Sequence, residues 1–192
     1  MKHNITLAAL LTATLVLGAF SNSSSAQSKS ELAAMQQRLA ALEAESQIRD
    51  KLQSYMAVLS ASDWYNYIYY FTKDAKLLMT EGTRQGRADI KERMSTAGIR
   101  LGKAAEARPK YKRADLLSII QVKVHGNTAD AKSRFTFLSG NAEGGFEVSG
   151  SGLYIDTWAL EEGEWRISSR QVDYDLLRTA PQPPAPSPVK PK

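Results

Sequence analysis

Few side chains in this 192-residue sequence could do chemistry, and most of them are carboxylates, tyrosines and arginines. The chain has no cysteine, which excludes a thiol nucleophile and a disulfide framework. Its two histidines do not suggest a general base, because His3 lies in an apolar leader and His125 precedes Gly126 in a predicted tight turn. Without paired histidines, thiols or carboxylates at ligand spacing, the sequence predicts no metal site. A Ser-His-Asp triad is equally unsupported.

Asp115, which opens a predicted strand, carries the carboxylate that could act as a base. Leu117 and Ile119 follow on the same strand face, because side chains alternate between the two faces. If that face lines an apolar cavity, burial would make the carboxylate of Asp115 a usable base. The alternative is a structural ion pair with one of three arginines, namely Arg113, Arg134 or Arg170. An arginine partner would favour binding over catalysis.

Three larger side chains are candidates for the wall of a binding pocket. Tyr55 lies on the apolar face of a predicted helix, where its hydroxyl either faces the pocket or is satisfied inside the core. Arg170 could bind an anionic group bidentately, or it could be the buried partner of Asp156 or Asp173. Trp64 opens a second, short helix and belongs either to the pocket wall or to the core.

Both ends of the sequence differ in composition from its middle. Residues 1–26 combine a basic start, the uncharged run Ile5–Phe20 and small residues up to Ala26, which is typical of a cleaved signal peptide. The apolar run is shorter than the ~20 residues that span a bilayer, so we expect no stable membrane anchor. Residues 179–192 hold six of the seven prolines and are predicted to be a disordered tail. We therefore expect a periplasmic or secreted protein.

Residues 27–44 are predicted to form a helical arm. Large apolar residues spaced three, four and three apart give it a short coiled-coil seam, formed by Leu32, Met35, Leu39 and Leu42. The apolar phase then changes, and Ile48, Leu52 and Tyr55 mark one face of a core helix. The arm could pair with another subunit or pack on its own sheet. We expect a homodimer or a small oligomer.

Residues 45–178 show the pattern of an α+β domain. Helices are predicted at 64–71 and 88–99, a loop at 102–112, and strands at 75–80, 115–124, 128–138, 146–160 and 165–175. Helices followed by a long antiparallel meander fit a curved sheet that wraps around helices and leaves a cavity. There is no βαβ alternation and no glycine-rich phosphate loop. The formal charge of +5, without basic runs interleaved with aromatic residues, predicts no nucleic-acid binding.

Four segments together resemble one family, namely residues 48–77, 85–94, 116–135 and 152–175. Their order and spacing are similar to those of SnoaL-like, nuclear-transport-factor-2-like proteins, which are relatives of scytalone dehydratase and ketosteroid isomerase. The resemblance implies a cone-shaped α+β fold, with N-terminal helices packed on a curved antiparallel sheet around a pocket. It also implies a small, largely apolar substrate or ligand. Where such proteins are enzymes, the resemblance implies lyase or isomerase chemistry without a cofactor.

The resemblance further implies an aspartate that orients a histidine base, and this sequence departs from that pair at both positions. Ser60 stands where the family has the aspartate, three residues before Asp63. Asp115 stands where the family has the histidine. Serine has no charge with which to orient an imidazole, and here there is no imidazole to orient.

Two functions therefore remain open. In the first, the protein binds a small apolar or aromatic molecule without chemistry, in a pocket formed by Ser60, Trp64, Leu117, Ile119 and Arg170. In the second, the protein is a divergent, cofactor-free lyase or isomerase. Its proton transfer would then depend on Asp115 together with a tyrosine, for which Tyr55 is the best candidate.

Overall fold

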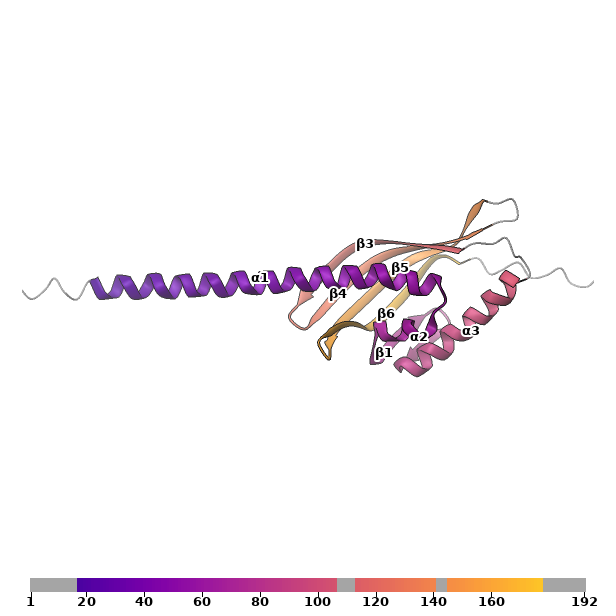
Figure 1. The fold of residues 1–192 in the computed structure, drawn as a ribbon, viewed down its shortest axis with the longest axis horizontal. Coiled ribbons are helices and arrows are strands. Elements are labelled where there is room, and N and C mark those ends of the chain that lie inside the picture. The colour runs from indigo at the N-terminus through magenta and orange to yellow at the C-terminus, as the bar shows by residue number, and fades with distance from the viewer. Residues whose placement is uncertain (1–16, 107–112, 141–144, 178–192) are drawn as a thin grey trace, which may run out of the picture. The chain divides into compact units, whose positions relative to one another are not determined.

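The computed structural model describes residues 17–106, 113–140 and 145–177 (Figure 1). The chain divides into two compact units, Met1–Leu42 and Glu43–Lys192. Helix α1, Leu17–Ser60, begins in the first unit and ends in the second. The expected proline-rich tail lies outside the described residues, as do residues 1–16 of the expected signal peptide.

The first unit contributes the helical arm. Every side chain from Ser28 to Ala40 is exposed, which leaves the apolar residues of the seam in contact with water. Over the parts of the chain that the structure covers, no helix combines the length and the apolar character needed to cross a membrane.

The second unit begins with the last turns of α1. Ile48, Leu52, Tyr55 and Leu59 recur every three or four residues, and all four side chains are buried. The predicted apolar face of the core helix is therefore confirmed. The helix ends at Ser60, and the chain reverses through Ser62, which takes a positive φ of 55°.

The short helix predicted at residues 64–71 is split in two. Asp63 caps α2 (Trp64–Tyr67) by accepting a hydrogen bond from the backbone N–H of Asn66 at 3.1 Å. A hydrogen bond from the Asn66 side chain, together with this backbone bond, lowers the pKa of Asp63. A 3-10 turn, η1 (Ile68–Tyr70), follows. The predicted helix was one residue too long, because Phe71 already pairs with Ile167 in the sheet.

Six strands form one mixed sheet in the order β2-β1-β6-β5-β4-β3. Their bounds are β1 Phe71–Met79, β2 Gly82–Gln85, β3 Arg113–His125, β4 Thr128–Gly140, β5 Phe146–Glu161 and β6 Glu164–Leu177. β1 runs parallel to β6, and the other neighbouring pairs are antiparallel. The long strands β3 to β6 follow one another as the predicted meander, which confirms the α+β fold class.

Helix α3 extends from Gly86 to Glu106 and packs against β1 and β2. The sequence predicted a helix that ends at Ile99 and a loop that begins at Gly102. This boundary was wrong, because one glycine inside a helix costs only about 1 kcal/mol and the alanines that follow it favour the helix.

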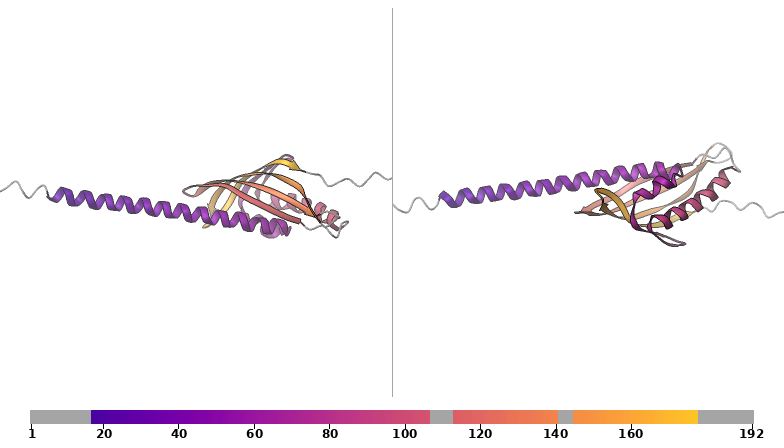
Figure 2. Two further views of the ribbon diagram at one scale, coloured as in Figure 1. Left: turned by 90° about the horizontal axis from the view of Figure 1, so that it is seen from above. Right: turned by 60° about the horizontal axis from the view of Figure 1, so that its bottom comes forward.

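The core lies between the helices and one face of the curved sheet (Figure 2). Along β4, alternate residues Ala129, Ala131, Ser133 and Phe135 are buried, as their period of two predicts. Trp158 on β5 is fully buried in the same cluster. The side chains on this face therefore pack into the core between the sheet and the helices. The position of any remaining cavity decides which residues can meet a ligand.

Candidate functional site

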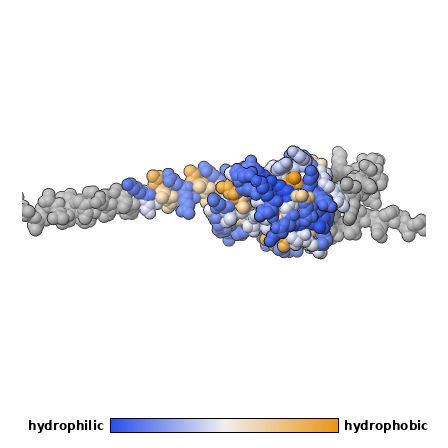
Figure 3. Space-filling view, turned by 90° about the horizontal axis from the view of Figure 1, so that it is seen from below, coloured by the Kyte–Doolittle hydropathy of each residue, from blue (hydrophilic) through white to orange (hydrophobic). Residues whose placement is uncertain are grey.

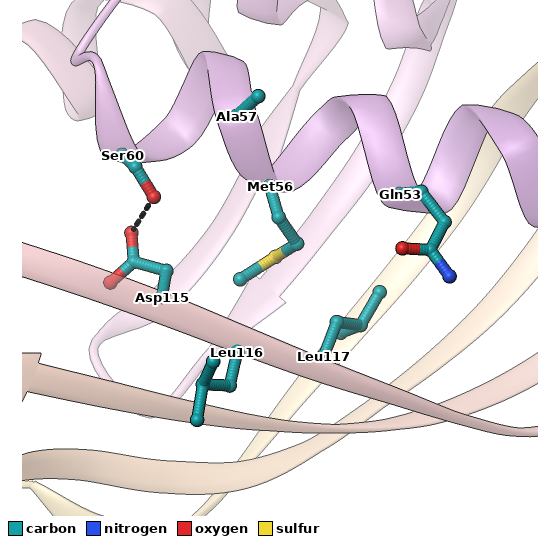
Figure 4. Close-up of a pocket in the computed structure, with 7 residues that line it drawn as sticks. All are labelled: Gln53, Met56, Ala57, Ser60, Asp115, Leu116 and Leu117. Atoms are coloured by element: carbon teal, nitrogen blue, oxygen red, sulfur yellow. Dashed lines mark hydrogen bonds between the residues drawn. The ribbon is translucent and has the colours of Figure 1, made fainter.

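A cavity of about 380 Å³ lies between the last turns of α1 and the start of β3 (Figure 4). Seven residues line it, namely Gln53, Met56, Ala57, Ser60, Asp115, Leu116 and Leu117. Its volume falls in the range of small-molecule sites in proteins. All seven residues belong to the second unit.

One face of α1 supplies the first wall of the cavity. Gln53, Met56, Ala57 and Ser60 are spaced three, one and three residues apart, which places them one above the other on a helix. On β3, Asp115 and Leu117 share the strand face that points towards α1, whereas Leu116 points to the other face (Figure 4). The cavity therefore has an apolar wall of Met56 and Leu117 beside a polar end.

The polar end consists of a hydroxyl and a carboxylate. The Ser60 hydroxyl donates a hydrogen bond to Asp115 Oδ2 at 2.9 Å, and both side chains are partly buried. Asp115 lines the cavity, where a carboxylate can accept a hydrogen bond from a ligand and disfavours an anionic one.

Tyr55 lies in the core, outside the lining of this cavity. Its side chain is 1% exposed, and its hydroxyl is 3.0 Å from the hydroxyl of Tyr67. The ring also packs edge-on against Tyr70 and Tyr154. Burial raises the pKa of Tyr67 well above its usual value, and the neighbouring Tyr55 hydroxyl adds to this shift. The fold therefore does not bring Tyr55 and Asp115 together at the cavity.

Arg170 is also buried, at 0% exposure, and forms two hydrogen bonds with Asp156 of 2.7 and 2.6 Å. Its guanidinium lies over the rings of Tyr55 and Tyr154, 4.4 and 4.0 Å from their centroids. Burial opposes the charge of Arg170, but the Asp156 carboxylate outweighs this, so the pKa of Arg170 stands well above its usual value. Of the two carboxylates considered for Arg170, Asp156 is the partner.

The remaining predicted site residues lie away from the cavity. Trp64 is half-buried and packs edge-on against Tyr67, with ring centroids 5.6 Å apart. Ile119 is half-buried against the core cluster. His125 is exposed at the end of β3, where its Nε2 atom is 3.4 Å from Asp130. Within the described ranges, no three His, Asp or Glu side chains lie close enough together to hold a metal ion.

A model of the SnoaL-like domain matches residues 40–171. The chain belongs to the SnoaL-like family. Its fold is shared by an NTF2-like protein with a cystatin-like fold from Novosphingobium aromaticivorans, with a TM-score of 0.61 and 22% identity over 74% of this chain and 87% of that one. ActVI-ORFA from Streptomyces coelicolor is similar with a TM-score of 0.59 and 20% identity, over 70% of this chain and 97% of that one.

A protein from Catenulispora acidiphila, solved in complex with S-DNPA, has a TM-score of 0.54 and 18% identity over 68% of this chain and 92% of that one. The comparison with curated proteins gives no match. At these identities the solved structures establish the fold of this SnoaL-like chain and nothing finer.

Sequence reasoning named Ser60, Asp115 and Leu117 but missed four cavity residues, namely Leu116, Gln53, Met56 and Ala57. A signal for the three on α1 was present, because counting back three, four and seven positions from Ser60 on a helix gives Ala57, Met56 and Gln53. The sequence held no comparable signal that Tyr55 lies in the core and does not line the cavity. Its neighbour on that helical face, Met56, lines the cavity and is itself only 5% exposed.

Proposed function

We propose that this SnoaL-like chain is an exported pocket protein that binds a small, largely apolar or aromatic molecule without transforming it. The observation that carries this proposal is the hydrogen-bonded pair of Ser60 and Asp115 at one end of a cavity whose wall includes Met56, Ala57 and Leu117. These two residues occupy the positions at which the family resemblance implies an aspartate and a histidine. The side chains at these two positions still contact each other, but a serine replaces the orienting aspartate and an aspartate replaces the histidine base.

The cavity lining defines the chemistry of the ligand. Met56, Ala57 and Leu117 suit an apolar body, whose removal from water contributes roughly 25 cal/mol per Å². Asp115 suits a hydroxyl or amino group on that body, because an ionised carboxylate only accepts hydrogen bonds. The same charge disfavours an acidic ligand, and no compensating arginine is at hand, since Arg170 is held by Asp156 and does not line the cavity. The ligand is therefore a neutral or cationic molecule with at least one donor.

The C. acidiphila neighbour, solved in complex with S-DNPA, supports a ligand-binding role for a protein of this fold. Export is supported by the signal-peptide pattern of residues 1–26. Protein purified from its natural host should therefore begin at or near Gln27, as N-terminal sequencing would determine. An intact Met1 on the cell-associated protein would contradict export.

A cofactor-free lyase or isomerase is the second candidate, and the carboxylate of Asp115 at the cavity favours it. In that case Asp115 would act as a base without the help of Tyr55, whose hydroxyl is turned to Tyr67. Molecules that co-purify with the protein distinguish the two functions by mass spectrometry. A binder releases its ligand unchanged after incubation, whereas an enzyme releases a dehydrated or rearranged product.

Three probes of similar shape test the proposed ligand chemistry, namely toluene, phenol and benzoate. Calorimetry should show that phenol binds about tenfold more tightly than toluene, because a hydrogen bond to a charged group contributes roughly 1.5 kcal/mol or more. Benzoate should bind most weakly of the three. Asp115→Leu should remove the preference for phenol, whereas the control Asp130→Leu, at an exposed carboxylate of β4, should keep it. Equal affinities of the wild type for all three probes would refute the proposal.

A further inference from the structure

The arm helix exposes an apolar seam that the proposed function does not use. Leu32, Met35, Leu39 and Leu42 are between 56% and 66% exposed. In Figure 3 orange, hydrophobic side chains alternate with blue ones along the coloured part of the arm. Four large side chains on one helix, all exposed to water, indicate a surface that another apolar surface covers.

The spacing of the seam selects the kind of partner. Intervals of three, four and three residues are the a and d positions of two successive heptads, which pack as knobs into the holes of another helix with the same repeat. The repeat stops where Ser46 and Arg49 take the next a and d positions. The seam therefore fits a helical partner of the same short length.

We propose that residues 28–42 of α1 form a parallel, in-register two-stranded coiled coil with the same segment of a second copy of this chain. Each seam residue, from Leu32 to Leu42, then packs against the same residue of the other copy. Eight large side chains, four from each chain, leave water together, and each contributes about 1.5 kcal/mol or more when fully buried.

The charges beside the seam fit a parallel pair. With Leu32 at position a, Arg38 stands at g and Glu43 at the following e. In a parallel dimer g faces the next e of the partner, so Arg38 of each copy meets Glu43 of the other copy. Glu31 at g meets the neutral Gln36 at e in the same way. The arm thus carries two attractive contacts per dimer and no repulsive one along the seam.

A single introduced cysteine tests orientation and register, because the chain has no cysteine of its own. Leu42→Cys places two thiols in the same layer of a parallel dimer, within the ~4.4–6.8 Å between Cα atoms that a disulfide spans. Under mild oxidation this full-length variant should run as a covalent dimer. The control Gln37→Cys, at position f on the outer side of the helix, should not.

An antiparallel arrangement would place Leu42 opposite Leu32 of the other copy, about 15 Å along the helix from its counterpart. The absence of a covalent Leu42→Cys dimer would therefore overturn the proposal. Equal cross-linking of Gln37→Cys would overturn it as well, since it would indicate random collision.

Sedimentation equilibrium on charge variants tests the flanking contacts. Arg38→Glu should weaken dimerisation, because it faces Glu43 of the other copy with a like charge. The double variant Arg38→Glu/Glu43→Arg should restore it. Leu39→Asp should raise the dissociation constant at least about tenfold, since it buries a charge in the seam. Wild-type association in all three variants would show that another surface holds the copies together.

Discussion

Two carboxylates on long strands of the same sheet, Asp156 on β5 and Asp115 on β3, have opposite surroundings. Asp156 of β5 is 2% exposed and accepts hydrogen bonds from the Nε and Nη2 atoms of Arg170. Asp115 of β3 is partly buried, accepts a hydrogen bond from Ser60 and lines an open cavity. The first carboxylate is enclosed in the core with its arginine partner, whereas the second lies at the wall of a cavity. The two side chains are of the same type, so their positions relative to the cavity decide which of them is a candidate for ligand binding.

The buried pair is tightly constrained for a physical reason. Removing two charges from water costs several kcal/mol per ion, which is offset only by good geometry and further contacts. In this pair the two short hydrogen bonds provide the geometry, and the rings of Tyr55 and Tyr154 provide the further contacts. Arg170 could bind an anionic ligand only if this cluster opened. The binding function we propose therefore depends on Asp115.

Removing one half of the buried pair should have the largest effect. Arg170→Met leaves Asp156 without its partner in the core, so we expect a loss of about 3–5 kcal/mol in the free energy of unfolding. The double variant Arg170→Met/Asp156→Leu removes both charges and should recover most of that loss. Urea denaturation of the two variants provides the measurement. A single variant as stable as the wild type would contradict the structural role of the pair.

A smaller loss is expected from Tyr55→Phe. The substitution leaves the buried Tyr67 hydroxyl without its tyrosine partner, which costs on the order of 1 kcal/mol. Phenol affinity should not change, because Tyr55 does not line the cavity. Thermal unfolding and calorimetry measure the two effects. Weaker phenol binding without loss of stability would place Tyr55 at the site and favour the enzyme hypothesis.

Asp115→Asn should have the smallest effect on stability. Asparagine keeps a side-chain oxygen that can accept from Ser60, so the free energy of unfolding should fall by no more than about 1 kcal/mol. The midpoint of urea denaturation measures this change. An increase in stability would mean that the carboxylate is unfavourable where it stands. That result would make proton transfer by Asp115 the better account.

Much of the fold could be predicted because its signals are local. The period of two along β4 and the helical period from Ile48 to Leu59 follow directly from the residue order. The pairing of Ser60 with Asp115, 55 residues apart in sequence, was accessible only because the family resemblance matched both positions. No local sequence pattern indicates that Ser60 and Asp115 lie close together.

One of two site assignments, that of Tyr55, depended on a contact that no local pattern carries. The partner of Tyr55 is Tyr67, which lies on another helix, so the direction of its hydroxyl depends on how α2 packs. The choice of Asp156 over Asp173 for Arg170 could have been made from strand alternation. Arg170 and Asp173 are three positions apart on β6 and point to opposite faces, whereas Asp156 is directly paired with Arg170.

The most direct test of the central claim is an NMR titration of the wild-type protein with phenol, which follows each backbone amide. We predict that the largest chemical-shift changes occur at Gln53, Ala57 and Ser60 of α1 and at Asp115 and Leu117 of β3. Amides of Asp156 and Arg170 should remain unperturbed. Changes concentrated at Asp156 and Arg170, with none at Ser60 and Asp115, would contradict the account.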